Sequence, residues 1–189
     1  MKLDPKRTAL VAIDLQKGIL GAPIAPHPAA TVVANATRLA EALIAGGGLA
    51  VRVHVGFSAD GADRLKQEVD QAMGGGPRPP DWAEFVPEVA AWSGGLEIVK
   101  RQWGAFFGTE LDLQLRRRGL DTIVLAGVAT NFGVEQTARE GWQLGYSIVV
   151  AEDAASSVSE AAHRFAVETT LPRVARVRST EAILAALAV

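Results

Sequence analysis

Apolar, strand-like runs alternate with helix-like stretches along almost the whole chain, and this alternation limits the possible folds more than any other feature. Residues 8–14 (TALVAID) form a short apolar run, as expected for a strand covered on both faces. From Val32 to Leu43, apolar residues recur at helical spacing until three glycines end the helix. Further strands are expected over residues 49–55, 96–100, 122–126, 147–151 and 174–177, and further helices over residues 109–118, 131–144, 160–171 and 180–188.

Strands separated by helices pair in parallel through right-handed crossovers. The 189 residues therefore predict one domain spanning positions 1–189. We expect a three-layer α/β/α fold around a doubly wound, mostly parallel, six-stranded, Rossmann-like sheet. Functional sites in such sheets form beyond the carboxyl ends of the strands, near the point where the strand order reverses. This rule directs attention to Asp14, Lys100 and the turn after Ala126.

One long connection, from Gly56 to Gly95, interrupts the alternation. It contains Gly74-Gly75-Gly76 and Pro77, several further prolines, and three aromatic residues. A connection of this length is typical of a lid, a binding loop or an oligomer contact. Together with the apolar composition, it favours a homo-oligomer, either a dimer or a tetramer, which the family resemblance given below also implies.

Composition excludes several classes of function. Hydrophobic residues make up 49% of the chain and charged residues 21%, as in an average globular protein. The formal net charge of -2 favours neither nucleic acid nor an anionic membrane as a partner. The absence of cysteine excludes disulfides and thiolate metal sites. With no signal-peptide core near the N-terminus and no apolar run of about 20 residues, a cytoplasmic protein is expected.

Two charged residues stand at predicted strand ends. Asp14 closes the first strand, where an unpaired buried carboxylate would be costly, although a turn or cap residue is the simpler alternative. Lys100 closes the third strand and could be an ordinary lysine that extends from a strand end into water. If the two residues meet, they form an ion pair that can stabilise charge or relay a proton.

The turn after the fourth strand has the features of a binding site for an anion or an oxyanion. Thr130 or Asn131 could cap the helix that follows, and the free N–H groups of its first turn would face a ligand. A plain strand-to-helix turn is the alternative. Gly133 leaves that backbone uncovered. Trp103 and Phe107 follow Lys100 and could form the wall of an apolar pocket, or equally belong to the core or an interface.

The remaining polar candidates favour structural roles. His27, His54 and His163 are scattered and lack the spacing typical of metal ligands, so no metal site and no cofactor are predicted. Glu152 and the aspartate after it follow the fifth strand and could cap a helix.

Four ordered segments, covering residues 9–16, 100–109, 127–139 and 149–154, resemble the isochorismatase-like cysteine hydrolase superfamily. In that family an aspartate, a lysine and a cysteine form the catalytic set, and the resemblance assigns the first two roles to Asp14 and Lys100. Gly133 takes the position of the cysteine. The resemblance also implies a cis peptide between Val128 and Ala129, and an oxyanion-hole equivalent near Ala129 and Gly133. The expected small-molecule site consists of Asp14, Lys100 and Gly133 as catalytic positions, and Gln16, Trp103, Phe107, Ala129, Thr130 and Asn131 as substrate contacts.

Without a thiol, the resemblance implies a hydrolase that acts on a small metabolite with no acyl-enzyme intermediate. True isochorismatases cleave a vinyl ether with the aspartate as acid, and Asp14 would fill that role. The alternative is a catalytically inactive protein that binds a small ligand on the same scaffold. A flavodoxin-like protein is disfavoured because no G-x-G-x-x-G motif follows the first strand. The metal-binding cluster of nicotinamidases has no counterpart after the second strand.

Overall fold

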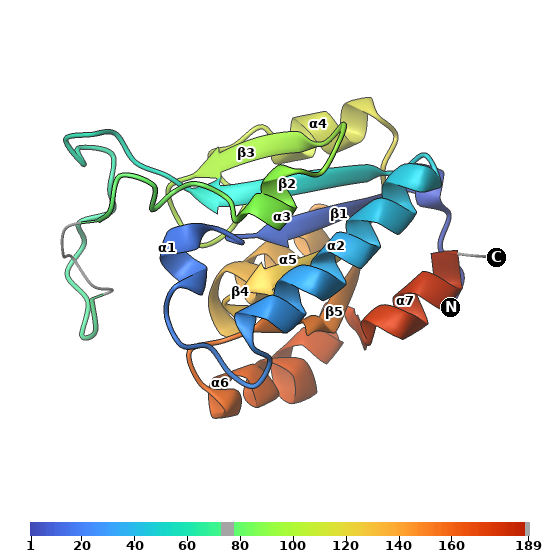
Figure 1. Cartoon of the computed structure of the whole chain (residues 1–189). Coiled ribbons are helices and arrows are strands. Elements are labelled where there is room, and N and C mark those ends of the chain that lie inside the picture. Colours follow the sequence, from blue (N-terminus) through green and yellow to red (C-terminus); the bar gives the residue numbers. More distant parts are fainter. Residues whose placement is uncertain (73–77, 188–189) are drawn as a thin grey trace.

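The computed structural model describes residues 1–72 and 78–187 and has one six-stranded sheet at its centre (Figure 1). All neighbouring strands are parallel, in the order β3-β2-β1-β4-β5-β6. The chain moves outward from β1 through β2 to β3, then returns to the other side of β1 and continues through β5 to β6. The strands are β1 (Thr8–Ile13), β2 (Leu49–Val55), β3 (Leu96–Lys100), β4 (Thr122–Val128), β5 (Ser147–Ser156) and β6 (Arg176–Arg178).

Helices cover both faces of the sheet, which confirms the predicted three-layer, doubly wound α/β fold (Figure 1). One hydrophobic core lies between the sheet and a layer consisting of α2 (Ala29–Ala45), α3 (Pro87–Ala90) and α7 (Thr180–Leu187). The other core lies beneath α4 (Leu111–Arg117), α5 (Glu135–Gln143) and the turns η3 (Ala166–Thr170) and η4 (Leu171–Arg173). The remaining elements are η1 (Pro5–Arg7), α1 (Lys17–Leu20), η2 (Thr130–Val134) and α6 (Glu160–Phe165).

Two predicted strands, β2 and β3, have the observed bounds, whereas β1 ends one residue earlier than expected, β6 is shifted to Arg176–Arg178, and β4 and β5 are longer than expected. β4 continues two residues past the predicted end, to Val128, and β5 continues five residues further, to Ser156. The pairing register of β4 and β5 shifts between Leu125 and Gly127, so β5 contains extra residues opposite a short stretch of β4. A bulge of this kind turns side chains in new directions. Glu152 therefore lies within a strand rather than after one.

The predicted helices differ from the observed ones mainly at their ends. The stretch over 131–144 begins as a π-helical turn, η2, before α5 continues it. The stretch over 160–171 likewise divides into α6 and two turns. Ala188, at the end of the last predicted helix, lies outside the described residues. Among the described residues, no helix is both long enough and apolar enough to cross a bilayer.

The long connection between β2 and β3 contains one short helix, α3. The part of the connection before α3 extends away from the sheet, beyond the carboxyl ends of the strands (Figure 1). Its Gly74-Gly75-Gly76 and Pro77 lie outside the described residues. The guanidinium carbon of Arg78 lies 4.8 Å from the ring centre of Phe57 and 4.0 Å from that of Trp82. A β-bridge between Gln16 and Phe85 joins the connection to the segment after β1. The structure therefore places part of this connection beside the carboxyl end of the sheet.

Candidate functional site

The strand order reverses between β1 and β4, and Asp14 follows β1 at this point. The Asp14 N–H donates to the carbonyl of Val53 across a distance of 2.8 Å, which holds the residue against β2. Its φ angle of 55° lies in the left-handed region, which few residues other than glycine adopt. Strained backbone of this kind occurs often at functional sites. The observation therefore favours a functional role for Asp14 over a simple turn.

Lys100 reaches Asp14 from two strands away. β3 and β1 lie on opposite sides of β2, about 10 Å apart at normal strand spacing. The lysine side chain crosses this gap, and its Nζ lies 2.8 Å from Asp14 Oδ2 and 3.1 Å from the carbonyl oxygen of Gln102. The Lys100 side chain is 2% exposed and that of Asp14 is 10% exposed, so the ion pair is buried with a small opening at the carboxylate.

Burial raises the pKa of the Asp14 carboxyl above its ordinary value of 3.8, because removal from water disfavours the charged form. The Lys100 ammonium opposes this shift through its charge and its hydrogen bond, and His54 opposes it more weakly. Oδ1 of Asp14 is buried and has no hydrogen-bond partner among the described residues. A buried oxygen without a partner can meet a water molecule or a substrate atom.

The turn after β4 approaches Asp14 because two glycines allow it. Gly127 has a φ angle of 119°, and a Cβ atom built there would lie 2.0 Å from the carbonyl oxygen of Ile13. Only glycine therefore lets β4 pass so close to the end of β1. A Cβ atom at Gly133 would lie 2.9 Å from Cγ2 of Ile13 and 3.5 Å from Asp14 Oδ2. The peptide between Val128 and Ala129 is cis, as the family resemblance implied.

The first residues of η2 do not cap it, and the expected capping by Thr130 or Asn131 is wrong. Ala129 is the residue before the turn, and no side chain accepts a hydrogen bond there. The Thr130 hydroxyl lies 2.9 Å from Nδ1 of His163 instead. The side-chain amide oxygen of Asn131, Oδ1, accepts a hydrogen bond from the Ser157 hydroxyl. Both side chains therefore fasten η2 to neighbouring segments and leave its N-terminus free of side-chain partners among the described residues.

Trp103 and Phe107 lie on the turn after β3 but in different surroundings. The Trp103 ring lies 4.7 Å from that of Phe132, and its carbonyl oxygen is 3.3 Å from the position of a Cβ atom at Gly133. Trp103 is thus a neighbour of the site. Phe107 is 75% exposed, and its carbonyl accepts a hydrogen bond from the Gln102 side chain. Its ring therefore covers little of the site in this structure.

Two residues of α5 that sequence reasoning missed hold this turn, and one of them also binds η2. The Thr137 hydroxyl donates to the carbonyl of Gly133 at 2.6 Å and accepts from the N–H of Ala105 at 3.1 Å. A carboxylate oxygen of Glu140 accepts from the N–H of Phe106 at 3.0 Å. Residues 133, 137 and 140 are separated by four and three positions and so share one helix face. This spacing is visible in the sequence and could have indicated that Thr137 and Glu140 lie on the same helix face as Gly133.

Gln16 is fully buried, and its amide binds the main chain rather than open space. Its oxygen accepts from the N–H of Val55 at 3.0 Å, and its nitrogen donates to the carbonyls of Val55 and Trp82 at 3.3 and 3.1 Å. Gln16 therefore holds the end of β2 and the long connection beside Asp14. Gln16 could contact a substrate directly only if its amide shared one of these hydrogen bonds with the substrate.

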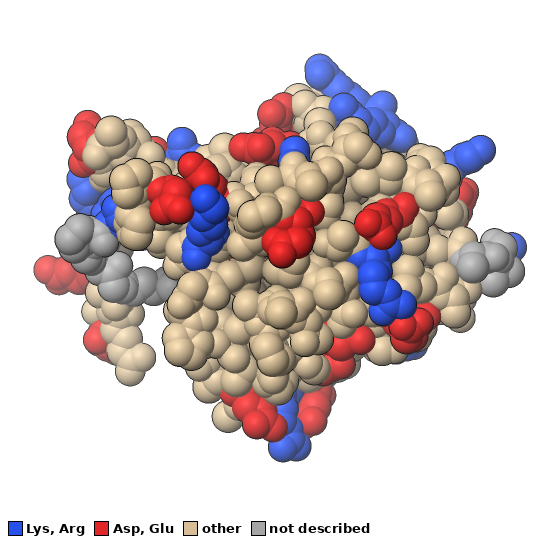
Figure 2. Space-filling model, viewed as in Figure 1, with Lys and Arg blue, Asp and Glu red and all other residues tan. Residues whose placement is uncertain are grey.

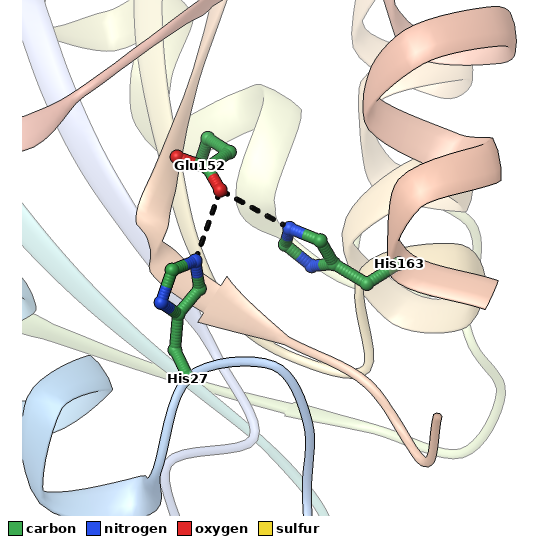
Figure 3. A group of neighbouring side chains, drawn as sticks. All are labelled: His27, Glu152 and His163. Carbon is green, nitrogen blue, oxygen red and sulfur yellow. Dashed lines mark hydrogen bonds and ion pairs between the residues drawn. The ribbon is translucent and has the colours of Figure 1, made fainter. Parts of the chain in front are cut away.

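A second group of polar side chains lies on the β5 side of η2. Within the described residues, His27, Glu152 and His163 form the one group of three ligand-type side chains close enough to hold a metal ion (Figure 3). The expectation that Glu152 caps a helix is wrong, because its carboxylate faces the two histidines. The following aspartate, Asp153, does accept the N–H of Thr180 at the start of α7. His54 lies apart, beside Phe85 and Glu97.

A cavity of about 550 Å³ opens elsewhere, beside α1 and α2. Its lining includes Leu20, Val33 and Val86, and none of the nine residues expected to form the site. The candidate site therefore lies where Asp14, Lys100 and η2 converge, away from this cavity.

The sequence and the fold agree on one family. The isochorismatase domain family matches residues 8–182. The chain belongs to the isochorismatase family. The isochorismatase family protein YecD of Escherichia coli O157:H7 is 50% identical over 187 residues, covering 99% of this chain and 100% of YecD. The isochorismatase family protein YwoC of Bacillus subtilis is also 50% identical, over 97% of this chain and 96% of YwoC.

Solved structures of the isochorismatase family show the same architecture. That of an isochorismatase family protein from Burkholderia thailandensis is 41% identical, with a TM-score of 0.95 over 100% of this chain and 98% of that one. The protein is thus a member of the isochorismatase family without cysteine.

Proposed function

We propose that this isochorismatase-family protein hydrolyses a small metabolite without a covalent thiol intermediate. Asp14 acts as the acid and base, Lys100 is its charge partner, and Gly133 brings its backbone close to Asp14 at the position where the family has a nucleophilic side chain. The remaining predicted contacts, from Ala129 to Asn131 and at Trp103, surround the substrate, and Gln16 positions the segment after Asp14. Phe107 contributes only if its ring turns inward when substrate binds.

The contact between Asp14 and Lys100 beneath Gly133 is the observation that carries this proposal. One carboxylate oxygen lies 2.8 Å from the lysine nitrogen, while the other has no partner among the described residues. Structural ion pairs are usually hydrogen-bonded at both oxygens when they are buried, because an orphaned buried acceptor costs free energy. An orphaned oxygen at the strand-order reversal point supports a catalytic role over a structural one.

The raised pKa of Asp14 supports acid chemistry. In the hydrolysis of a vinyl ether, the protonated carboxyl gives its proton to the terminal carbon of the double bond. The carbon that carries the ether oxygen becomes an oxocarbenium ion, and water adds to it. The ionised carboxylate takes the proton released by that water, and the hemiketal separates into a ketone and an alcohol. Lys100 stabilises the transient carboxylate and limits how far burial raises its pKa.

A panel of small vinyl ethers and small amides, assayed for product formation, tests the proposal. The wild type should turn over at least one vinyl ether, and Asp14→Asn should reduce kcat/KM by about 10²–10⁴-fold, the usual contribution of general acid catalysis. Asp121→Asn is the matched control, because Asp121 immediately precedes β4, at the opposite end of the strand, and pairs with Arg7. Equal turnover by the wild type and Asp14→Asn would exclude Asp14 from the mechanism.

The same panel separates the proposed hydrolase from an inactive binding protein. A binding protein would retain small anions in equilibrium dialysis, yet it would form no product with any compound. A hydrolase shows product whose formation falls as the pH rises through the pKa of Asp14, because the acid form is then lost. Product formation that rises over the same range would contradict the assignment of Asp14 as the acid.

A further inference from the structure

We propose that His27, Glu152 and His163, hereafter the histidine–glutamate cluster, bind one divalent transition-metal ion of the Zn²⁺ type. Three separate segments supply the side chains: the loop before α2, the bulged part of β5, and α6 (Figure 3). The site lies apart from the acid–lysine pair of Asp14 and Lys100, and the proposal is independent of the proposed hydrolysis.

The three ligand atoms already lie near the spacing that a metal requires. Nε2 of His27 is 2.9 Å from Oε1 of Glu152, and Nε2 of His163 is 3.4 Å from the same oxygen. One ligand atom from each residue lies within 4.8 Å of the others. Ligands of a tetrahedral Zn²⁺ site stand about 3.4 Å apart, given bond lengths of about 2.1 Å. Small side-chain rotations would therefore bring the set into coordination.

The identity of the ligands selects the class of metal. Two imidazoles and one carboxylate are the donors that Zn²⁺ and similar ions prefer, whereas Mg²⁺ and Ca²⁺ prefer oxygen donors. Three protein ligands leave a fourth tetrahedral position open for water. The His27 side chain is 25% exposed and that of Glu152 is 35% exposed, so an ion can enter from solvent.

The residues behind the ligands hold them in place. His163 is 1% exposed, and its Nδ1 lies 2.9 Å from the Thr130 hydroxyl, which fixes the ring with Nε2 directed at the carboxylate. A bond from the second ring nitrogen to a neighbouring polar group is the usual support of a metal-binding histidine. The N–H of His27 donates to the hydroxyl of Ser156 at 3.2 Å, which fastens the His27 loop to the end of β5.

A metal here would also stabilise η2. Thr130 is the first residue of η2, and Gly133 lies in the same turn. The ion would thus connect α6 and the His27 loop to the turn that approaches Asp14, through His163 and Thr130. The expected consequence is a more stable fold with metal bound, because ligands that bind only the folded state shift unfolding by mass action.

Calorimetric titration of the chelator-treated protein with Zn²⁺, and its visible absorption with Co²⁺, test the site. The wild type should bind a single equivalent of Zn²⁺, and bound Co²⁺ should give the intense absorption of four-coordinate geometry. Glu152→Gln and His27→Gln, both at partly exposed positions, should abolish saturable binding. Thr130→Val, which removes only the supporting hydroxyl, should weaken binding by about 10–100-fold. His54→Gln is the control and should bind as the wild type does.

Circular dichroism and melting curves of each variant without metal verify that the variants are folded. The proposal is overturned if the wild type binds no Zn²⁺ or Co²⁺, if Glu152→Gln binds as tightly as the wild type, or if His54→Gln loses binding to the same degree. A rise in melting temperature with Zn²⁺ that is present in the wild type and absent in His27→Gln would support it. The absence of any such rise in the wild type, despite saturable binding, would refute the stabilisation of η2.

Discussion

The acid–lysine pair and the histidine–glutamate cluster both place charged and polar side chains around η2, yet they differ in burial and origin. Asp14 and Lys100 are almost completely buried, whereas His27 and Glu152 of the cluster remain partly open to solvent. Asp14 directly follows β1 and Lys100 ends β3, both regular parallel strands, whereas Glu152 lies on the bulged part of β5. The pair is therefore fixed by the sheet, and the cluster by loops and local irregularity.

This difference predicts how each region responds to loss of a charge. A buried ion has no water to replace a lost partner, so its free energy depends strongly on that partner. A partly exposed carboxylate can exchange a protein partner for water at little cost. Equivalent carboxylate-to-amide substitutions in the two regions should therefore have very different effects on stability.

Asp14→Asn is expected to have the largest effect. The amide keeps the size of the side chain but removes the charge opposite Lys100, whose nitrogen lies 2.8 Å from Asp14 Oδ2 and whose side chain is 2% exposed. Leaving one member of a buried ion pair uncompensated costs about 3–5 kcal/mol. The free energy of unfolding from urea denaturation at neutral pH measures this loss. The double variant Asp14→Asn/Lys100→Met should recover part of it, and a loss as small as that of an exposed pair would contradict the buried geometry.

Gly133→Ala tests how closely η2 approaches the acid–lysine pair. The new Cβ atom would lie 2.9 Å from Cγ2 of Ile13 and 3.3 Å from the carbonyl oxygen of Trp103. Overpacking of this degree costs about 2–3 kcal/mol, again measured by urea denaturation. In an Ile13→Ala background the same substitution should cost markedly less, since the contacted methyl group is gone. Equal costs in both backgrounds would show that Ile13 does not limit the approach.

Lys100→Met should make stability fall with rising pH over a wider pH range than in the wild type. Burial already raises the pKa of Asp14 in the folded protein, so Asp14 contributes stability below its unfolded value of 3.8 that is lost as the pH rises through the folded value. Without the lysine, the folded pKa rises further. The unfolded chain then binds fewer protons than the folded one over a wider range, and stability falls by up to about 1.4 kcal/mol per pH unit there.

Unfolding free energies of the wild type and Lys100→Met, compared across mildly acidic and neutral pH, measure this slope. The two proteins should differ least at acidic pH, where Asp14 is protonated in both. A difference that is constant across the range would mean that Lys100 does not change the pKa of Asp14 in the folded protein.

The sequence predicted where Asp14 and Lys100 lie because strand ends follow simple rules. Apolar runs locate β1 and β3, and the carboxyl ends of parallel strands meet at one edge of the sheet. These two facts bring Asp14 and Lys100 to the same edge, and the family resemblance assigned them a joint role. The position of Gly133 came from the family resemblance. The role of Gly127, which lets β4 approach the end of β1 closely, is evident only from its backbone angles.

The histidine–glutamate cluster could not be predicted in the same way. His27 and His163 are 136 positions apart, and neither has metal-ligand spacing with another histidine. Their approach depends on the register shift in β5 and on the β-bridge between Ala25 and Ser157, which positions the His27 loop. Local propensity does not encode a bulge or a long-range loop contact. The strand predicted to end at Ala151 therefore excluded Glu152, which lies within β5 in the structure. The predicted capping roles of Thr130 and Asn131 failed for the same reason, because their partners come from distant segments.

Glu152→Gln should have the smallest effect of the four substitutions and completes the comparison. Its carboxylate lies 2.9 Å from His27 Nε2 and 3.4 Å from His163 Nε2, but the side chain is 35% exposed. The amide oxygen can still accept a hydrogen bond from either ring, and water can solvate the rest. Without metal, the loss in unfolding free energy should stay below about 1 kcal/mol at neutral pH, as for other partly exposed pairs. A loss as large as that of Asp14→Asn would show that the cluster is as tightly coupled to the fold as the buried pair, and would remove the distinction between the two regions.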